Sequence, residues 1–187
     1  AKRGKDPLAG PLRLGIIYTI GPYLLPELVR QVIERSPQMP LMLQENFTVK
    51  LLEMLRTGDI DCAVMAEPFP DTGLAVAQLY DEPFVVALPP DHAWTRKKSV
   101  KAAELPEDNL LLLGSGHCFR DQVLDACHEF ARPAVEGKQG NSLETIRNMV
   151  ASGLGITVLP ASANSARYRN RLLQVIPFTK PVPARRI

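Results

Sequence analysis

The chain has 187 residues, of which 45% are hydrophobic and 22% are charged, and its formal net charge is +2. This is an ordinary globular composition, and the near-neutral charge provides no electrostatic footprint for nucleic acid or for an anionic membrane surface. No run approaches the roughly 20 apolar residues of a membrane span, no hydrophobic signal segment is present, and three cysteines do not make a disulfide framework, so we expect a cytoplasmic protein.

The first half of the chain alternates predicted strands with predicted helices. Residues 1–11 are basic, contain glycines and prolines and show no periodicity, which predicts a linker. The periodicity of the apolar residues then predicts strand 12–18, helix 24–36, strand 39–44, helix 48–58 and strand 60–65. Strands that alternate with helices of this length are expected to pair in parallel, with right-handed crossovers.

Two threonines in this half fall where a predicted strand ends and a helix is about to begin. Thr19 precedes the first helix and Thr48 opens the second. The carboxyl ends of parallel strands are where ligands collect, although a threonine at such a position is more often a helix N-cap. We therefore expect caps, with ligand contacts as the alternative. Cys62, in the third strand, is expected to be buried and to serve packing only.

The second half predicts a second subdomain that the chain enters and leaves once. Strand 79–88 ends at two prolines, where we place a crossing, and strand 155–160 is expected to cross back. These boundaries give residues 12–88 and 161–187 to subdomain I, whose C-terminal part is expected to be truncated, and 89–160 to subdomain II. The remaining predicted elements are loops around a short helix in 91–108, strand 110–113, an irregular stretch 132–140, helix 143–153 behind an Asn141 to Glu144 capping box, and strand 175–178.

Two of the three cysteines lie together in the segment 114–130, where a glycine-broken loop precedes a helical pattern. One helix face collects Phe119, Val123, Ala126, Cys127 and Phe130. This pattern places Cys127 on the buried side and Cys118 at or just before the helix N-terminus, where the macrodipole and the nearby Arg120 and His117 favour a thiolate. Nine residues of helix rise about 13.5 Å, whereas the Cα atoms of a disulfide lie about 4.4–6.8 Å apart. A disulfide between Cys118 and Cys127 would therefore require the helix to unwind, and oxidation would act as a switch.

Other chemistries are less well supported by this segment. The glycines of 114–116 lack the lysine and the third glycine of a phosphate loop, so no nucleotide cofactor is expected. A metal set of His117, Cys118, Cys127 and His128 would be split by helical geometry, so no metal is expected either. Adjacent His117 and Cys118 side chains usually point apart, which disfavours a cysteine hydrolase. Two unreactive core thiols remain the structural alternative to a redox pair.

Two motifs carry a resemblance to a known family. The sequence GHCFRDQ at 116–122, followed by Cys127, and the sequence SLETIRNMVASGLGITVLP at 142–160 closely resemble the regulatory domains of the OxyR family, the LysR-type transcription regulators that sense hydrogen peroxide. The second motif also resembles LysR-type effector domains in general, and the similarity extends over most of the chain from Leu12. The resemblance implies an α/β fold of two Rossmann-like subdomains joined by two crossover strands, similar to periplasmic binding proteins.

The resemblance also implies roles for individual residues. Cys118 matches the peroxide-reactive cysteine and Cys127 the resolving cysteine, while the residues that match positions around the peroxide pocket are Thr19, Thr48, His117, Arg120 and Asp121. Peroxide would oxidise Cys118 to a sulfenic acid, and Cys127 would then form the intramolecular disulfide. Residues 119–126 would refold and switch transcription activation, so the implied protein is a sensor and not an enzyme.

The implied partners are those of a whole regulator. They are hydrogen peroxide, further copies of the chain in a dimer or tetramer, RNA polymerase, a thiol reductant of the glutaredoxin or thioredoxin type, and promoter DNA bound through an N-terminal helix-turn-helix domain that is absent from this chain. No membrane is implied. Two alternatives stay open: an effector domain that binds a small organic inducer between its subdomains, and a thiol peroxidase that turns over many times.

Overall fold

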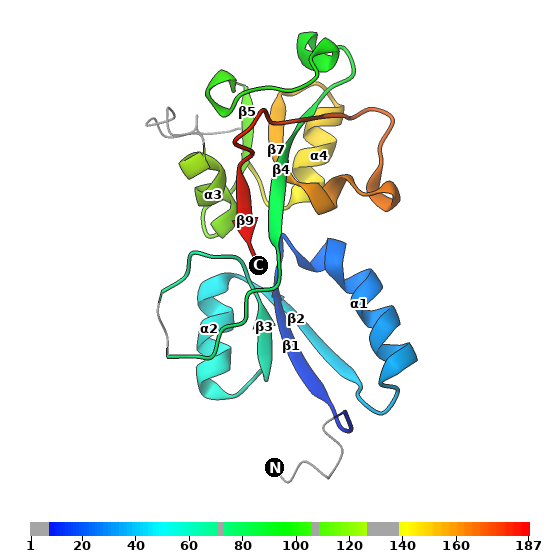
Figure 1. Cartoon of the computed structure of the whole chain (residues 1–187), viewed down its shortest axis with the longest axis vertical. Coiled ribbons are helices and arrows are strands. Elements are labelled where there is room, and N and C mark those ends of the chain that lie inside the picture. The colour runs from blue at the N-terminus through cyan, green and yellow to red at the C-terminus, as the bar shows by residue number, and fades with distance from the viewer. Residues whose placement is uncertain (1–7, 71–72, 106–108, 127–138) are drawn as a thin grey trace. The chain divides into compact units, whose positions relative to one another are not determined.

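The computed structural model describes residues 8–70, 73–105, 109–126 and 139–187, which form two compact units, Ala1–Val76 and Ala77–Ile187 (Figure 1). Each unit contains strands and helices, so the predicted α/β class is confirmed. No helix in the described part of the chain is long and apolar enough to cross a membrane.

Unit 1 is a three-stranded parallel sheet with one helix on each side. The strands β1 (Leu12–Ile17), β2 (Leu41–Asn46) and β3 (Cys62–Val64) lie in the order β2-β1-β3, and both pairings are parallel. The helices α1 (Gly21–Arg35) and α2 (Thr48–Thr57) lie on opposite sides of this sheet (Figure 1). The alternating elements of the first half and their parallel pairing are thus as predicted.

The limits of α2 follow from its sequence. The helix ends at the predicted residue, because Gly58 has a φ of 75° and its N–H donates to the carbonyl oxygens of the last turn. Apolar Leu51, Leu52 and Met54 are buried beneath it. The buried side of the helix is thus formed by Leu51, Leu52 and Met54, whereas Val49 in its first turn is 80% exposed.

The described residues of unit 2 form a mixed sheet of six strands with two α-helices. Its order is β6-β5-β7-β4-β8, with β9 pairing beside β8 on β4. The strands are β4 (Asp81–Leu88), β5 (Leu110–Leu113), β6 (Gln139–Gly140), β7 (Ile156–Pro160), β8 (Gln174–Pro177) and β9 (Ala184–Arg186). Strand β5 pairs in parallel with β6 and β7, whereas β4 is antiparallel to β7, β8 and β9. Every residue of β5 and β7 is buried, so the core of the unit lies along these two strands.

The helices of unit 2 are α3 (Cys118–Ala126) and α4 (Leu143–Ala151), and short 3-10 turns occupy 93–96 and 102–104, as the prediction of loops around a short helix requires. The predicted cap of α4 needs correction. Ser142, and not Asn141, is the N-cap, and its Oγ accepts a hydrogen bond of 3.1 Å from the N–H of Thr145. Glu144 is thus one residue too early for a capping box and instead lies 3.2 Å from Arg147 Nε.

The observed division of the chain differs from the predicted one. The boundary falls at Val76 and Ala77, so residues 77–88 and 161–187, predicted in subdomain I, group with residues 89–160. Strand pairing gives the physical reason: β4 hydrogen-bonds to β7, β8 and β9, and this binds all four strands into one sheet. Two of the strands, β6 and β9, were not predicted, because two or three residues are too few to show an alternating pattern.

Candidate functional site

The cysteine segment, residues 114–130, begins after the buried strand β5 with a turn that contains Gly114 and Gly116. Gly116 has a φ of 95°, a left-handed conformation that favours glycine. Two residues later α3 begins at Cys118, as predicted. Since the first N–H groups of a helix lack helical acceptors and carry the positive end of its dipole, this position favours the thiolate form of a cysteine. The Cys118 residue is partly exposed.

His117, which precedes Cys118, is buried. Its residual exposure is 8%, and burial lowers its pKa from the usual 6.5, while a hydrogen bond to the backbone of Asn141 partly opposes that shift. The imidazole is therefore neutral at pH 7 and has a basic nitrogen. A neutral imidazole can accept a proton, which is the role a thiol or peroxide would require of it.

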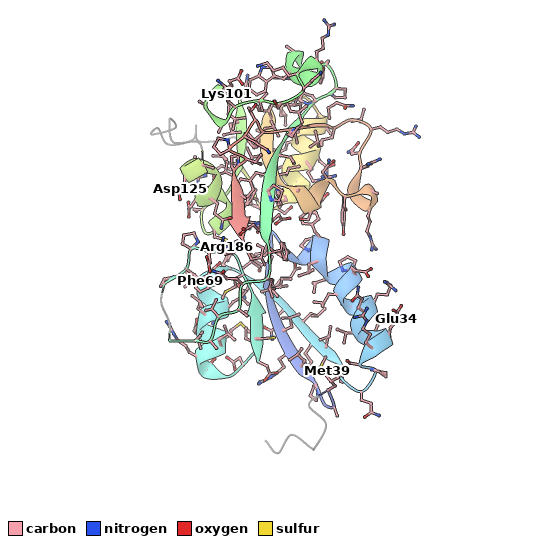
Figure 2. All side chains as sticks on the ribbon, viewed as in Figure 1. Glu34, Met39, Phe69, Lys101, Asp125 and Arg186 are labelled. Carbon is pink, nitrogen blue, oxygen red and sulfur yellow. The ribbon has the colours of Figure 1, made fainter. Side chains whose placement is uncertain are left out.

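Arg120 and Asp121 complete the first turn of α3. The Arg120 backbone N–H donates to the His117 carbonyl at 3.0 Å, and its Nη1 donates to the carbonyl of Leu113, the last residue of β5, at 3.1 Å. Asp121 is exposed, as is Asp125 one helical turn later, which points outward from α3 in Figure 2. Arg120 thus links the first turn of α3 to the end of β5.

Phe119, the residue after Cys118, is buried against an aromatic ring and an ion pair. The Phe119 ring packs edge-on against Phe84 of β4, with the centroids 5.1 Å apart and the rings at 74°, and the guanidinium carbon of Arg185 lies 5.0 Å from its centroid. Arg185 in turn forms a buried ion pair with Glu82, at 2.7 Å. None of these three neighbours of Phe119 was predicted from the sequence. A signal for two of them existed, since Glu82 and Phe84 share one face of a strand.

The two predicted threonines lie in unit 1, apart in sequence from the cysteine segment in unit 2. The expectation that they cap helices is wrong: the N-cap residues are Ile20 and Phe47, and neither makes a side-chain cap bond. Thr19 is 2% exposed. Thr48 is the first residue of α2, and its buried Oγ1 has no hydrogen-bond partner within the described ranges. An unsatisfied buried hydroxyl is costly, which favours the ligand-contact alternative for Thr48.

The structure therefore brings His117, Cys118, Arg120 and Asp121 together at one end of α3. Cys127 and His128 lie outside the described residues, as does the predicted burial of Cys127. Cys62, predicted to be buried, is exposed in β3 because that three-residue strand turns it outward at the edge of the sheet. Among the residues described, no group of three or more His, Cys, Asp or Glu side chains could hold a metal ion.

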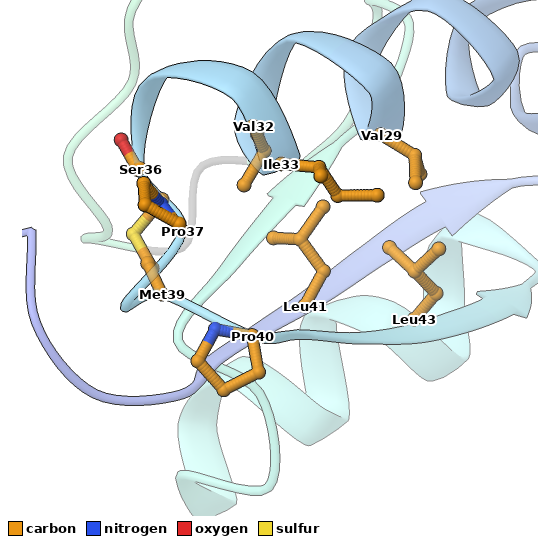
Figure 3. Close-up of a pocket in the computed structure, with 9 residues that line it drawn as sticks. All are labelled: Val29, Val32, Ile33, Ser36, Pro37, Met39, Pro40, Leu41 and Leu43. Carbon is orange, nitrogen blue, oxygen red and sulfur yellow. The ribbon is translucent and has the colours of Figure 1, made fainter.

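An apolar groove occurs elsewhere in unit 1, between α1 and β2. In Figure 3, Val29, Val32 and Ile33 face Leu41 and Leu43 across it. The groove is open to solvent, with Ile33 66% exposed and Leu43 39% exposed. Its lining offers almost no polar group, so it suits an apolar surface and not hydrogen peroxide.

Comparison with known proteins identifies the family to which the chain belongs. The family model described as the LysR substrate binding domain matches residues 5–187. A curated relative from Mycobacterium avium, named a probable hydrogen peroxide-inducible genes activator, is 41% identical over 183 residues, which are 97% of this chain and 59% of that protein. The chain thus spans about three-fifths of the length of this relative.

Two solved structures resemble the whole fold. The reduced form of the OxyR regulatory domain from Pseudomonas aeruginosa is 49% identical with a TM-score of 0.85, over 96% of this chain and 87% of that one. A cysteine-to-serine mutant of OxyR from Corynebacterium glutamicum, in a form bound to hydrogen peroxide, is 34% identical with a TM-score of 0.88, over 96% of this chain and 57% of that one. The fold predicted from the sequence, with two subdomains like those of periplasmic binding proteins, is that of these relatives.

Proposed function

The chain belongs to the LysR substrate-binding domain family, and on this premise we propose that it is the regulatory domain of a transcription activator that senses hydrogen peroxide through Cys118. The single observation that carries the proposal is the position of Cys118 at the first residue of α3, behind a left-handed glycine and beside the buried His117. The names of the relatives, hydrogen peroxide-inducible genes activator and OxyR, agree with this chemistry.

The proposed reaction has two balanced steps. The Cys118 thiolate attacks one oxygen of hydrogen peroxide, the O–O bond breaks, and the sulfur becomes a sulfenic acid as hydroxide leaves. Arg120, in the first turn of α3, would stabilise the leaving oxygen, and the buried His117 precedes Cys118 directly. The Cys127 thiolate then attacks the Cys118 sulfur, the S–O bond breaks, and hydroxide leaves and takes up a proton to become water, which leaves the disulfide.

The helix observed in this structure is incompatible with that disulfide. From Cys118 to Ala126 it rises through eight steps, which is about 12 Å. Cys127 is one Cα step, about 3.8 Å, beyond Ala126. The two cysteine Cα atoms therefore lie about 8 Å or more apart while α3 persists, compared with about 4.4–6.8 Å in a disulfide. We infer that oxidation unwinds residues 119–126 and that this refolding is the signal.

The remaining partners belong to a longer protein. We propose that it acts in the cytoplasm, binds promoter DNA through an N-terminal helix-turn-helix domain, contacts RNA polymerase, and is reset by a glutaredoxin-like or thioredoxin-like reductant. Hydrogen peroxide would be consumed about once per chain, as in a sensor and not in an enzyme. The relatives' names as gene activators support this assignment.

We further propose that the chain self-associates, as a dimer or tetramer, through the groove between α1 and β2. This groove exposes apolar side chains that a second copy could cover. The substitution Ile33→Asp should shift the chain toward monomer in sedimentation velocity, because it introduces a charge into the apolar lining. Val49→Asp changes an equally apolar residue that is 80% exposed on α2 and should leave assembly unchanged. Equal sedimentation of both variants and the wild type would contradict the proposal.

Thiol counting with intact mass spectrometry tests the function itself. Substoichiometric peroxide should remove two thiols for each peroxide consumed in the wild type and none from the 118/127 pair in Cys118→Ser. A loss of two thiols that survives this substitution would refute the role of Cys118. Rapid repeated consumption of peroxide with a dithiol would identify a peroxidase, and unchanged thiols would favour an organic inducer.

A further inference from the structure

Strands β4 and β9 carry two ion pairs that differ sharply in environment. Asp81 lies opposite Arg186 and Glu82 lies opposite Arg185 in the antiparallel register. Because neighbouring strand residues face opposite sides of a sheet, one pair is buried and the other exposed. The Glu82 and Arg185 side chains are 5% and 0% exposed, whereas those of Asp81 and Arg186 are 58% and 46% exposed.

The buried pair touches the cysteine helix at one end. Arg185 donates from Nε and Nη2 to Glu82 Oε2, at 2.8 and 2.7 Å, and this fixes the plane of the guanidinium. That guanidinium lies 5.0 Å from the centre of the Phe119 ring. A cation held against an aromatic face without water is a favourable contact, and Phe119 directly follows Cys118.

At its other end the pair reaches a different element. Glu82 Oε1 accepts a hydrogen bond of 3.1 Å from the backbone N–H of Ser162, in the 3-10 turn Ala161–Asn164 that follows β7. One carboxylate thus joins three segments: β9 through Arg185, α3 through the Phe119 ring that packs against Arg185, and the turn after β7. None of these contacts is used in the reaction with peroxide proposed above.

We propose that Glu82 is a positioning residue for α3: it holds Arg185 against Phe119 and so stabilises the reduced helix relative to the disulfide form, and it ties that helix to the turn after β7. This inference rests on the proposed function, since the disulfide form is the state in which α3 is unwound. When α3 unwinds, Phe119 leaves the guanidinium and the contact is lost. Weakening the pair should therefore favour oxidation.

The midpoint potential of the 118/127 dithiol tests this directly. Glu82→Gln keeps the size and one acceptor oxygen but removes the charge, and it should shift the equilibrium toward the disulfide by about tenfold, about 30 mV more negative for this two-electron couple. Asp81→Asn makes the same chemical change in the exposed pair and should leave the potential unchanged. Arg185→Lys, which keeps the cation but loses the planar fork, should shift the potential in the same direction as Glu82→Gln.

Hydrogen exchange of the reduced chain separates this inference from the proposed function. The α3 amides and the Ser162 amide should exchange about tenfold faster in Glu82→Gln and at the wild-type rate in Asp81→Asn. If the wild type forms no disulfide, the proposed function fails, and the exchange rates still decide the role of Glu82. Equal exchange in the two variants, or equal potentials, would overturn the inference.

Discussion

The Phe119 ring is the contact through which the fold should hold the cysteine helix in place, and Phe119→Ala measures its strength. The ring is 2% exposed, packs edge-on against Phe84 and lies beneath the Arg185 guanidinium. Truncation of a buried phenylalanine to alanine typically costs about 3–5 kcal/mol, of which an aromatic pair contributes about 0.5–1.5 kcal/mol. Because an ion pair and a β-sheet surround the ring and cannot easily close the cavity, we expect Phe119→Ala to lower the free energy of unfolding by about 4 kcal/mol.

Urea unfolding of the reduced protein, followed by the fluorescence of Trp94, is the appropriate assay. Trp94 is the single tryptophan of the sequence and lies in unit 2, as Phe119 does. The control is Phe47→Ala, which removes a ring of similar edge-on geometry, 5.2 Å from Tyr18, that is 37% exposed in unit 1. It should change the Trp94 transition by less than about 0.5 kcal/mol. A decrease of less than about 1.5 kcal/mol in the free energy of unfolding for Phe119→Ala would refute the reasoning that the packing of Phe119 stabilises α3.

Three further predictions concern individual side chains. Burial lowers the pKa of His117, so the unfolded chain binds a proton at a higher pH than the folded chain does. In urea titrations the free energy of unfolding should therefore be constant above about pH 6.5 and decrease as the pH falls below it. His117→Gln should make this decrease smaller. Thr48→Val should change the free energy of unfolding little, because the buried Thr48 Oγ1 has no hydrogen-bond partner within the described ranges, whereas Thr57→Val, which removes a 2.6 Å bond from the end of α2 to Asp59, should cost about 1 kcal/mol. Cys62→Ser should preserve both the stopped-flow rate of Cys118 oxidation by peroxide and the loss of two thiols. A slower reaction of Cys118 would contradict the assignment of the redox pair.

The spacing of apolar residues predicted the longer helices and strands of this fold well. Residues 12–65 alternate apolar strands with amphipathic helices, and the structure reproduces that order and its parallel pairing. The start of α3 at Cys118 also followed from local chemistry, because glycines end one element and apolar spacing begins the next. What the sequence could not provide was the partner of each strand in unit 2, which depends on contacts between residues far apart along the chain.

The buried ion pair illustrates that limit. Glu82 and Arg185 are 103 residues apart, and nothing local distinguishes them from the exposed Asp81 and Arg186 beside them. Only the β4 and β9 register separates a carboxylate that supports the cysteine helix from one that faces solvent. The threonines show the converse case: their place before helices predicted caps, but the backbone uses Ile20 and Phe47 instead.

The central claim is that the α3 helix and the disulfide between Cys118 and Cys127 cannot coexist, and hydrogen exchange of reduced and peroxide-oxidised protein tests it most directly. We predict slow exchange across the amides of 119–126 in the reduced chain and its loss after oxidation, while the amides of β4 and β7 stay protected in both states. A disulfide established by peptide mass, together with unchanged protection of 119–126, would contradict the account.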